Sequence, residues 1–282
     1  MTDSGNEDQA EFWDEIAPAW AAAERHTELV AGRFGALAIG ALGLEPGRRV
    51  LDIGCGTGST TRALAAIVAP GGDALGVDIS QAMVEIARAQ ASETSSGTAR
   101  FEVADVQVDD LHGERFDAAF SRFGVMFFAD PAVAFTRVRE LLEPGGRLAF
   151  ASWQDLFLNE WMFVPGAAVV GVTGELPPMP APGEPGPFSL SGVDRIEALL
   201  SAAGFEDIVV EPRSEIVELP SSEVESIVEM SRSVGPVREA LRGADEALTA
   251  QLLEAVRNAL EAKVTDGVLQ LSAAAHIVTA RA

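Results

Sequence analysis

The chain of 282 residues is long enough for one α/β domain with segments added around its site, and a full second domain would be a tight fit. Its formal net charge of −23 argues against nucleic acid and anionic lipid as partners, because binding to phosphates needs a basic face. No apolar run reaches the roughly 18 residues of a membrane span, and the acidic start is unlike a signal peptide. The single cysteine rules out an intramolecular disulfide. We therefore expect a cytoplasmic protein that binds no membrane.

The first 44 residues are predicted to form an N-terminal helical lid. Apolar residues at helical spacing predict one helix over 7–24. A second helix over 27–42 is expected to end at Gly43, since glycine commonly follows the last turn of a helix. The turn at Pro46-Gly47 then separates the lid from the first strand.

Residues 45–155 are predicted to form the core, because short apolar strands alternate with helices there. This alternation is typical of a parallel sheet with helices on both faces. Ser80 is a suitable N-cap for one of these helices. We expect strands at 49–53, 74–77, 99–104, 116–120 and 147–152, and helices at 59–68, 81–91 and 131–142.

The regular alternation ends after residue 155. An insertion over 156–190 contains a predicted helix at 157–170 and an extended loop at 177–187, in which six of eleven residues are proline. Residues 191–282 are expected to complete the core with a helix at 192–203 and strands at 205–210 and 268–279, and to add a helical cap at about 221–264. The inserted segment with its proline loop is the candidate for a cap that binds an acceptor.

A glycine-rich loop at 54–58 lies between the first strand and the helix that follows it. Strand, loop and helix N-terminus together make an anion-binding site built from backbone N–H groups. Glycines at 54, 56 and 58 let a ligand approach the backbone closely. Dinucleotide-binding proteins use a related loop, but Ser59 stands here where that loop has its last small residue.

Three carboxylates lie at the ends of three successive predicted strands. Asp52, Asp78 and Asp105 are expected along the carboxyl edge of the sheet, where open α/β folds bind ligands. Asp52 would repel a pyrophosphate and would suit a ligand with an ammonium and a sulfonium, as in S-adenosylmethionine. Asp78 can accept both ribose hydroxyls, and Asp105 can accept from the adenine amino group. The alternative, that each acid caps the next helix, explains one such acid better than three.

These segments resemble the class I S-adenosylmethionine-dependent methyltransferases, in particular the ubiquinone/menaquinone-biosynthesis-like group that acts on small molecules. Residues 50–58 resemble the family's cofactor loop, 76–80 with Met83 its ribose- and adenine-binding strand end, and 104–106 its adenine-contacting turn. The resemblance covers about 10–155 well and 190–210 weakly. It implies a Rossmann-like three-layer sandwich with a seven-stranded, mostly parallel sheet whose last strand is antiparallel.

The resemblance also implies the cofactor, S-adenosylmethionine, and its contacts. Near the N-terminus the family often has tyrosine where this chain has Trp20, so an indole N–H would replace a hydroxyl, unless Trp20 only packs the lid helix. The implied cofactor-binding residues are Trp20, Asp52, Gly54, Cys55, Gly56, Gly58, Asp78, Ile79, Met83, Asp105, Val106 and Ser121.

The predicted function is transfer of a methyl group to an oxygen, nitrogen or carbon of a small metabolite, either quinone-like or a specialised natural product. A related enzyme that catalyses a cyclisation instead, and a non-catalytic cofactor-binding partner, remain as alternatives. A nicotinamide-dependent dehydrogenase is disfavoured by Asp52 and Ser59.

Methyl transfer needs a base only when the acceptor arrives protonated. His26 is the first candidate, although a solvated histidine at a helix end explains it as well. The helix N-terminus beside Cys55 would lower the pKa of its thiol, and a contact in the cofactor loop explains Cys55 better than a role as nucleophile.

Several side chains have two interpretations. Arg122 would either bind an acidic group of the substrate or pair with a surface carboxylate. An apolar acceptor wall and ordinary core packing both account for Trp153, Trp161, Met162 and Phe163. No metal site is predicted, since the three histidines lack ligand spacing.

Overall fold

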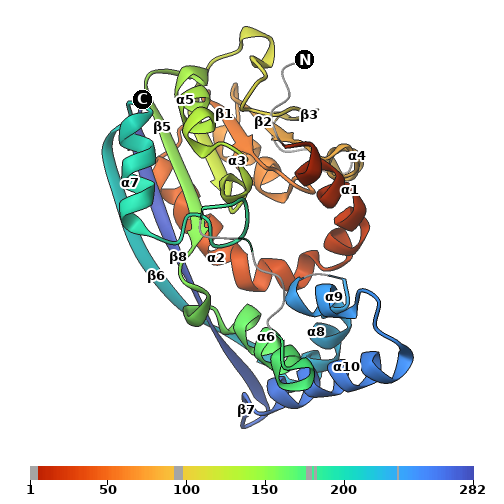
Figure 1. Cartoon of the computed structure of the whole chain (residues 1–282). Helices are drawn as coiled ribbons and strands as arrows, with labels where there is room; N and C mark the ends of the chain where they lie inside the picture. Colours follow the sequence, from red (N-terminus) through yellow and green to blue (C-terminus); the bar gives the residue numbers. More distant parts are fainter. Residues whose placement is uncertain (1–5, 92–97, 176–179, 181–182, 234) are drawn as a thin grey trace.

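A single mixed sheet runs through the molecule, which we describe from a computed structural model over residues 6–91, 98–175, 180, 183–233 and 235–282 (Figure 1). The strand order is β3-β2-β1-β4-β5-β8-β6, with β7 paired to β8 off this path. The strands are β1 Arg49–Ile53, β2 Asp73–Asp78, β3 Thr98–Val103, β4 Phe116–Arg122, β5 Leu142–Trp153, β6 Glu206–Pro220, β7 Val264–Thr265 and β8 Val268–Arg281.

The first five strands are parallel, whereas β8 is antiparallel to both of its neighbours, β5 and β6. The predicted Rossmann-like sheet with an antiparallel last strand is therefore confirmed. The middle strands are buried on both faces, which is why they read as apolar runs in the sequence. The parallel register brings the carboxyl ends of β1 to β4 to one edge.

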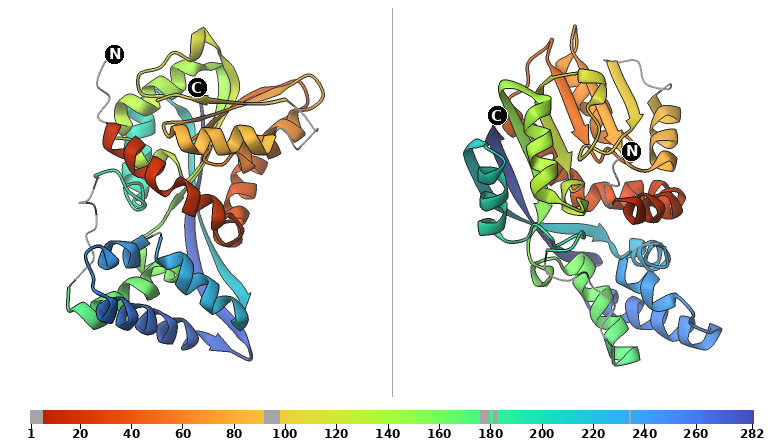
Figure 2. Two further views of the ribbon diagram at one scale, coloured as in Figure 1. Left: turned by 90° about the vertical axis from the view of Figure 1, so that its right-hand side faces the viewer. Right: turned by 45° about the horizontal axis from the view of Figure 1, so that its top comes forward.

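Helices pack on both faces of the sheet and form the outer layers. On one side α2 contacts β4, β5 and β8, while α3 and α4 contact β1 to β3. On the other side α5 packs on β5 and α7 packs on β6 (Figure 2). These helices are α1 Glu7–Ala22, α2 Glu24–Leu42, α3 Ser59–Val68, α4 Gln81–Ala91, α5 Pro131–Leu141 and α7 Val193–Ala202.

Local capping sets several helix ends where the sequence predicted them. Gly43 takes the left-handed conformation after α2, which glycine adopts without a Cβ clash. Ser80 Oγ accepts from the backbone N–H of Met83 at 3.1 Å and so caps α4. Asp130 does the same for α5. Because these signals are local, the predicted and observed ends agree to within a few residues.

Two strand predictions are too short. β5 begins at Leu142, five residues before its predicted start, because 144–146 stay in the sheet across an irregular pairing with β4. β6 continues to Pro220 and pairs with β8 along nearly its whole length. Most of β6 is exposed and polar, so apolar patterning marked only its first residues.

A second group of helices lies beyond the end of the core, on the long extension of β6 and β8 (Figure 2). It consists of α6 Glu160–Thr173, α8 Val224–Ser231, α9 Gly235–Leu241 and α10 Glu246–Glu261. The helices predicted at 157–170 and within 221–263 are thus present. Of the loop predicted at 177–187, residues 177–179 and 181–182 lie outside the described residues, and 183–187 form bends and turns. The division into lid, core, insertion and cap stays a prediction.

Short 3-10 helices connect the larger elements: η1 Leu111–Gly113, η2 Val125–Phe127, η3 Leu156–Leu158 and η4 Ser221–Glu223. Within the described part of the chain, no helix has the length and apolar character needed to cross a bilayer.

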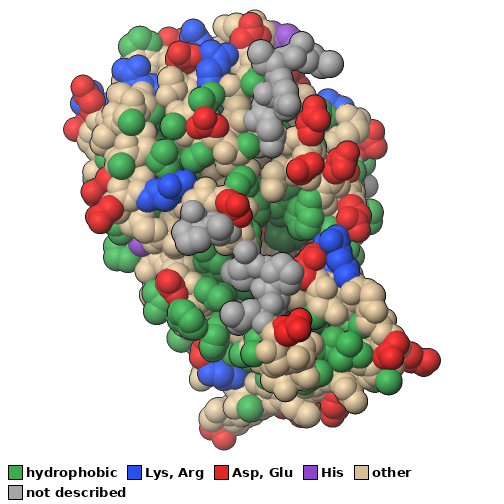
Figure 3. Space-filling view, viewed as in Figure 1, with side chains coloured by type: hydrophobic (Ala, Val, Ile, Leu, Met, Phe, Trp, Pro, Cys, Tyr) green, Lys and Arg blue, Asp and Glu red, His purple; other side chains and the backbone are tan. Residues whose placement is uncertain are grey.

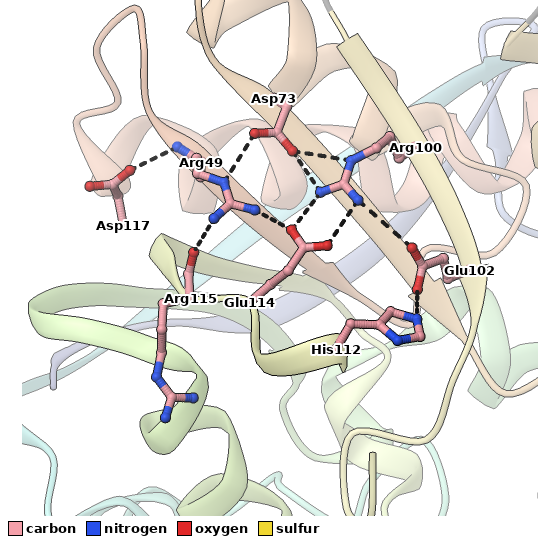
Figure 4. A network of polar contacts seen from close by, with 8 residues as sticks. All are labelled: Arg49, Asp73, Arg100, Glu102, His112, Glu114, Arg115 and Asp117. Carbon is pink, nitrogen blue, oxygen red and sulfur yellow. Dashed lines mark hydrogen bonds and ion pairs between the residues drawn. The ribbon is translucent and has the colours of Figure 1, made fainter. Parts of the chain in front are cut away.

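A network of arginines and carboxylates ties the strands together at the amino edge of the sheet (Figure 4). Arg100 donates to Asp73 Oδ2 at 2.8 Å and to Glu114 Oε1 at 3.1 Å. Arg49 lies between the same two carboxylates. The hydrogen bond from Arg100 holds the pKa of Glu114 below its usual value. This network joins β1, β2 and β3 to the segment that leads into β4.

Candidate functional site

The glycine-rich loop follows β1 at the opposite, carboxyl edge of the sheet. The N–H groups of Gly54 and Cys55 both donate to Val77 O, at 2.9 and 3.0 Å, which fastens the loop to β2. A Cβ on Gly54 would lie 2.9 Å from Cα of Gly124, so only glycine fits there. Gly56 also has a positive φ, and a Cβ on it would meet no atom within 4 Å. Its backbone therefore borders open space that a ligand can enter.

Asp78, at the end of β2, organises this loop. Its Oδ2 accepts from Gly56 N at 2.8 Å, and its Oδ1 accepts from Ser80 N at 3.0 Å. Burial raises the pKa of Asp78 in spite of these two hydrogen bonds, and the nearby charge of Asp14 adds to the rise. Among the described residues Asp78 has no cationic partner in an ion pair, so its charge is compensated only by backbone dipoles.

Asp52 is fully buried beneath the loop and joins β1 to α3. Its Oδ2 accepts from the hydroxyls of Thr60 at 2.7 Å and Thr61 at 2.6 Å. Its Oδ1 has no hydrogen-bond partner. Burial raises the pKa of Asp52 to about 6, against the effect of the two hydroxyls and of Arg122. Asp52 thus holds two threonine side chains of α3 without capping the helix, and its other oxygen has no hydrogen-bond partner.

Asp105 lies in the turn after β3 and is already engaged by a distant residue. Asn6 Nδ2 donates to Asp105 Oδ2 at 2.9 Å, and Asn6 Oδ1 accepts from Ala129 N at 3.0 Å. The buried Asn6 carboxamide therefore bridges the turns that follow β3 and β4. Nothing in the sequence marked Asn6, because its two partners lie about a hundred residues away along the chain.

The remaining predicted contacts lie close to the same edge. Ser121 Oγ donates to Ile53 O at 2.8 Å and accepts from Gly124 N and Val125 N, so it joins the ends of β1 and β4. Met83 and Val106 are buried, and Ile79 is half-buried. Ser121 therefore lies against the start of the glycine loop, and Ile79 directly follows Asp78 in the chain.

The expected effect of the helix N-terminus on Cys55 is wrong. Burial, with the charges of Asp78 and Asp52, raises the pKa of the Cys55 thiol well above its ordinary value. The side chain packs in a small apolar cluster with Val84, Ala87 and Phe101. Only the backbone of Cys55 belongs to the loop surface.

Helix α1 lies across the edge and docks on α4. Asp14 Oδ1 accepts from Ser80 Oγ at 2.6 Å and from Ala82 N at 3.0 Å. Trp13 packs edge-on against Trp20 and Phe127, with ring centroids 5.4 and 5.1 Å apart. Trp20 therefore packs on Trp13 of its own helix, and Trp13 makes the ring contact to Phe127 of η2.

Helix α2 adds two carboxylates that sequence analysis did not single out. Glu24 accepts from Thr57 Oγ1 at 2.9 Å, and Glu28 accepts from Ser59 Oγ at 3.0 Å. Arg122 reaches Glu28 at 2.6 Å and Ser59 Oγ at 3.0 Å. Of the two interpretations of Arg122, the structure shows the pairing with a carboxylate of the protein. On an exposed helix such acids have no distinguishing pattern in the sequence.

His26 connects α2 to η4. Its Nε2 lies 3.1 Å from Glu223 Oε2 in η4, and Arg25 donates to the other oxygen at 3.0 Å. Hydrogen bonds from His26 and Arg25 lower the pKa of Glu223. Further ion pairs, Arg33–Glu215 at 2.7 Å and Arg238–Glu15 at 2.8 Å, join the lid helices to β6 and α9.

A second aromatic cluster lies where the core meets the cap. Trp153 stacks on Phe123, and its ring centroid lies 5.0 Å from that of Trp161 in α6. Phe163 pairs instead with the exposed Phe157. The predicted acceptor wall is therefore split, with Trp153 and Trp161 together and Phe163 elsewhere. Figure 3 shows apolar side chains around a hollow between the upper and lower parts of the molecule.

A glycine loop followed by a helix, with acidic side chains at the carboxyl edge of a mostly parallel sheet, is typical of α/β proteins that bind a nucleoside-type ligand. The sequence profile of the methyltransferase domain matches residues 50–146. Nocamycin O-methyltransferase of Saccharothrix syringae is 32% identical over 201 residues, which cover 68% of this chain and 70% of the relative. The chain therefore belongs to the class I S-adenosylmethionine-dependent methyltransferases of small molecules.

Two further comparisons agree with this membership. The 2-phytyl-1,4-naphtoquinone methyltransferase of Synechococcus elongatus is 30% identical over 177 residues, covering 57% of this chain and 72% of the relative. A phosphoethanolamine N-methyltransferase of Haemonchus contortus, solved with S-adenosyl-L-methionine, shares the fold with a TM-score of 0.55 at 18% identity, over 100% of this chain and 60% of that one. For two other curated relatives the match spans only 41% and 48% of their length.

Proposed function

We propose that this chain transfers the methyl group of S-adenosylmethionine to an oxygen, nitrogen or carbon of a small, mainly apolar metabolite. The observation that carries the proposal is the pair of carboxylates at the glycine loop, the buried Asp52 and the half-buried Asp78. Neither makes an ion pair with a described residue, and burial raises the pKa of both. Such carboxylates favour a cationic ligand and disfavour a phosphorylated one.

The residues fit the cofactor as follows. Asp78 can accept further hydrogen bonds from the ribose hydroxyls, since a carboxylate has about four acceptor positions and the backbone N–H groups of Gly56 and Ser80 occupy one on each oxygen. The free Oδ1 of Asp52 suits the ammonium group, directly or through water. Asp105 would accept from the adenine amino group in place of the Asn6 carboxamide, which presents the same N–H donor. The other proposed contacts are Trp20, Gly54, Cys55, Gly56, Gly58, Ile79, Met83, Val106 and Ser121.

S-adenosylmethionine supplies a methyl group that is already activated by a positively charged sulfur. The protein therefore contributes mainly by positioning and by excluding water. Helix α1 closes the edge through Asp14 and the tryptophan cluster. Arg122 and Glu28 fix α2 on the start of α3. The acidic groups around the loop stabilise positive charge at the donor before transfer.

We propose that the acceptor enters between the core and the helices of the cap. All four tryptophans of the chain belong to the two aromatic clusters near this boundary. An apolar, aromatic acceptor suits such a surface. The names of the relatives, a nocamycin and a naphtoquinone methyltransferase, support a natural product or a quinone. The single buried cysteine supports a cytoplasmic location.

His26 is the proposed base for an acceptor that arrives protonated. Its contact with Glu223 would orient the imidazole. The test is the variant His26→Asn, with the pH profile of kcat as the readout. If kcat of the variant no longer decreases at low pH, His26 acts as a base. If kcat is lower by the same factor at every pH, His26 only connects α2 and η4.

Calorimetry with S-adenosylmethionine and with NAD tests the cofactor, and transfer of a radiolabelled methyl group to a panel of phenols, quinols and amines tests the reaction. We expect binding of the sulfonium compound alone, and label in an apolar aromatic acceptor. Binding of NAD, or indifference to both compounds, would contradict the proposal. Cofactor binding without transfer to any acceptor would favour the cyclisation or the non-catalytic alternative.

A further inference from the structure

Phe123 occupies a backbone conformation that bulky residues rarely adopt. Its φ is +67°, in the left-handed region that favours glycine. Hydrogen bonds of residue 123 itself and of the next residue hold this conformation. Phe123 N donates to Ala151 O at 3.1 Å, and Ser121 Oγ accepts from Gly124 N at 3.2 Å. Strain that the surrounding structure maintains in this way is commonly found at functional sites.

The strained backbone places the Phe123 ring flat on an indole. Its centroid lies 3.8 Å from that of Trp153, with 10° between the two planes. Phe34 packs edge-on against both rings, at 6.4 and 5.6 Å. Trp161 of α6 lies against Trp153 from the cap side. Phe34 and Trp153 are buried, while Phe123 is half-buried. Trp161 is half-buried as well, so Phe123 and Trp161 are the two outer rings of this stack.

The stack lies beside the glycine loop. A Cβ on Gly124, the next residue, would lie 3.0 Å from Cα of Gly54 and 2.8 Å from Ile53 O. The backbones after β1 and β4 thus touch one residue away from Phe123. The preceding residue, Arg122, is engaged by Glu28 and Ser59. A ring placed against Phe123 would therefore lie next to the end of the site that we assign to the methyl donor.

We propose that Phe123 is a specificity-determining residue, whose half-buried ring stacks against a planar aromatic ring of the acceptor on the face opposite Trp153. The inference rests on the proposed function, since it concerns the acceptor of that reaction. Offset stacking of two flat rings adds binding free energy beyond that of burying their apolar surface, and a saturated ring cannot make this contact. The platform selects an aromatic ring over a saturated ring system of the same size and polarity.

The test compares two probes, 1-naphthol and decahydro-1-naphthol, which share a ring skeleton and a hydroxyl but differ in planarity. Equilibrium dialysis against the full chain gives the ratio of their dissociation constants. We expect the natural chain to bind 1-naphthol about fivefold more tightly than its saturated counterpart, as expected for one added aromatic contact. The variant Phe123→Leu should abolish this preference, and Phe123→Trp should retain it.

The matched control is Phe157→Leu, which changes a phenylalanine of a ring pair outside the stack and should keep the natural preference. Thermal melting and the affinity for S-adenosylmethionine verify that each variant is folded. A preference that survives in Phe123→Leu, or is lost in Phe123→Trp, overturns the inference, as does a natural chain without any preference. Because this readout involves no methyl transfer, its failure is distinct from failure of the proposed reaction.

Discussion

The two ends of the same sheet carry similar side chains in opposite electrostatic states. At the amino end, Asp73 and Glu114 are held by Arg49 and Arg100, and the pKa of Glu114 is lowered (Figure 4). At the carboxyl end, Asp52 and Asp78 make no ion pair within the described ranges, and burial raises the pKa of both. Paired acids stabilise the fold, whereas unpaired buried acids lower its stability until a cationic ligand arrives.

Removing the carboxylate of Asp78 should have the largest effect on the carboxyl end. Asp78→Ala removes the proposed ribose contact and frees the Gly56 N–H, so we expect the affinity for S-adenosylmethionine to fall by roughly 30- to 100-fold, the cost of losing hydrogen bonds to a charged group. Calorimetry gives the change. The control is Asp73→Ala, at the other end of the same strand, which should lower the melting temperature and leave the affinity intact. Equal loss in both variants would contradict the contrast between the two ends.

Asp52→Asn should stabilise the protein without ligand and weaken the binding of the cofactor. The pKa of Asp52 rises from 3.8 to about 6 on folding, so the folded chain binds this proton more tightly. The group therefore lowers stability above its folded pKa, by about 3 kcal/mol at most, and the loss is recovered as the pH falls from about 6 toward 4.

Urea unfolding at about pH 8 and about pH 5 tests the sign. We expect Asp52→Asn to gain more stability at the higher pH, and its affinity for S-adenosylmethionine to fall by about tenfold. Thr61→Val removes one hydroxyl donor without removing the carboxylate, and should lower stability instead. If Asp52→Asn destabilises the empty chain at both pH values, the unpaired state of Asp52 is not what limits its stability.

Glu114→Gln should lower the folding stability through the amino end of the sheet alone. Its pH dependence should be opposite to that of Asp52→Asn. The pKa of Glu114 is lowered on folding, so its contribution is present at neutral pH and is lost as the pH falls through the folded pKa. The group is partly exposed, and we expect a loss of about 1 kcal/mol. Chemical unfolding measures it. A change in cofactor affinity would show that the two ends are coupled.

Glu223→Gln should have the smallest effect, because it keeps the side-chain shape and weakens only the contacts of η4 with Arg25 and His26 of α2. Arg25 and His26 lose a charged partner, and we expect a change of about twofold or less in the KM of an acceptor. The measurement is the salt dependence of KM, which the variant should flatten. Glu229→Gln, whose carboxylate pairs with Arg232 within the cap, serves as the control.

Much of the fold was predictable because its signals are local. The apolar runs gave β1 to β4 to within two residues, and the caps at Gly43 and Ser80 placed the ends of α2 and α4. The glycine loop and the acids at three strand ends located the candidate site. The lengths of β5 and β6 were missed, since a bulged start and a polar edge strand carry no apolar pattern.

The sequence by itself determined the order of the elements, the glycine loop and the row of acids at the carboxyl edge, because turn chemistry and hydrophobic periodicity act over a few residues. Only the tertiary structure decided which carboxylates form ion pairs with arginine side chains. It also brought Asn6 to Asp105, Glu28 to Arg122, and the ring of Phe123 onto Trp153. These partners lie tens to about a hundred residues apart, and the packing of whole helices against the sheet, rather than any local pattern, sets their distances.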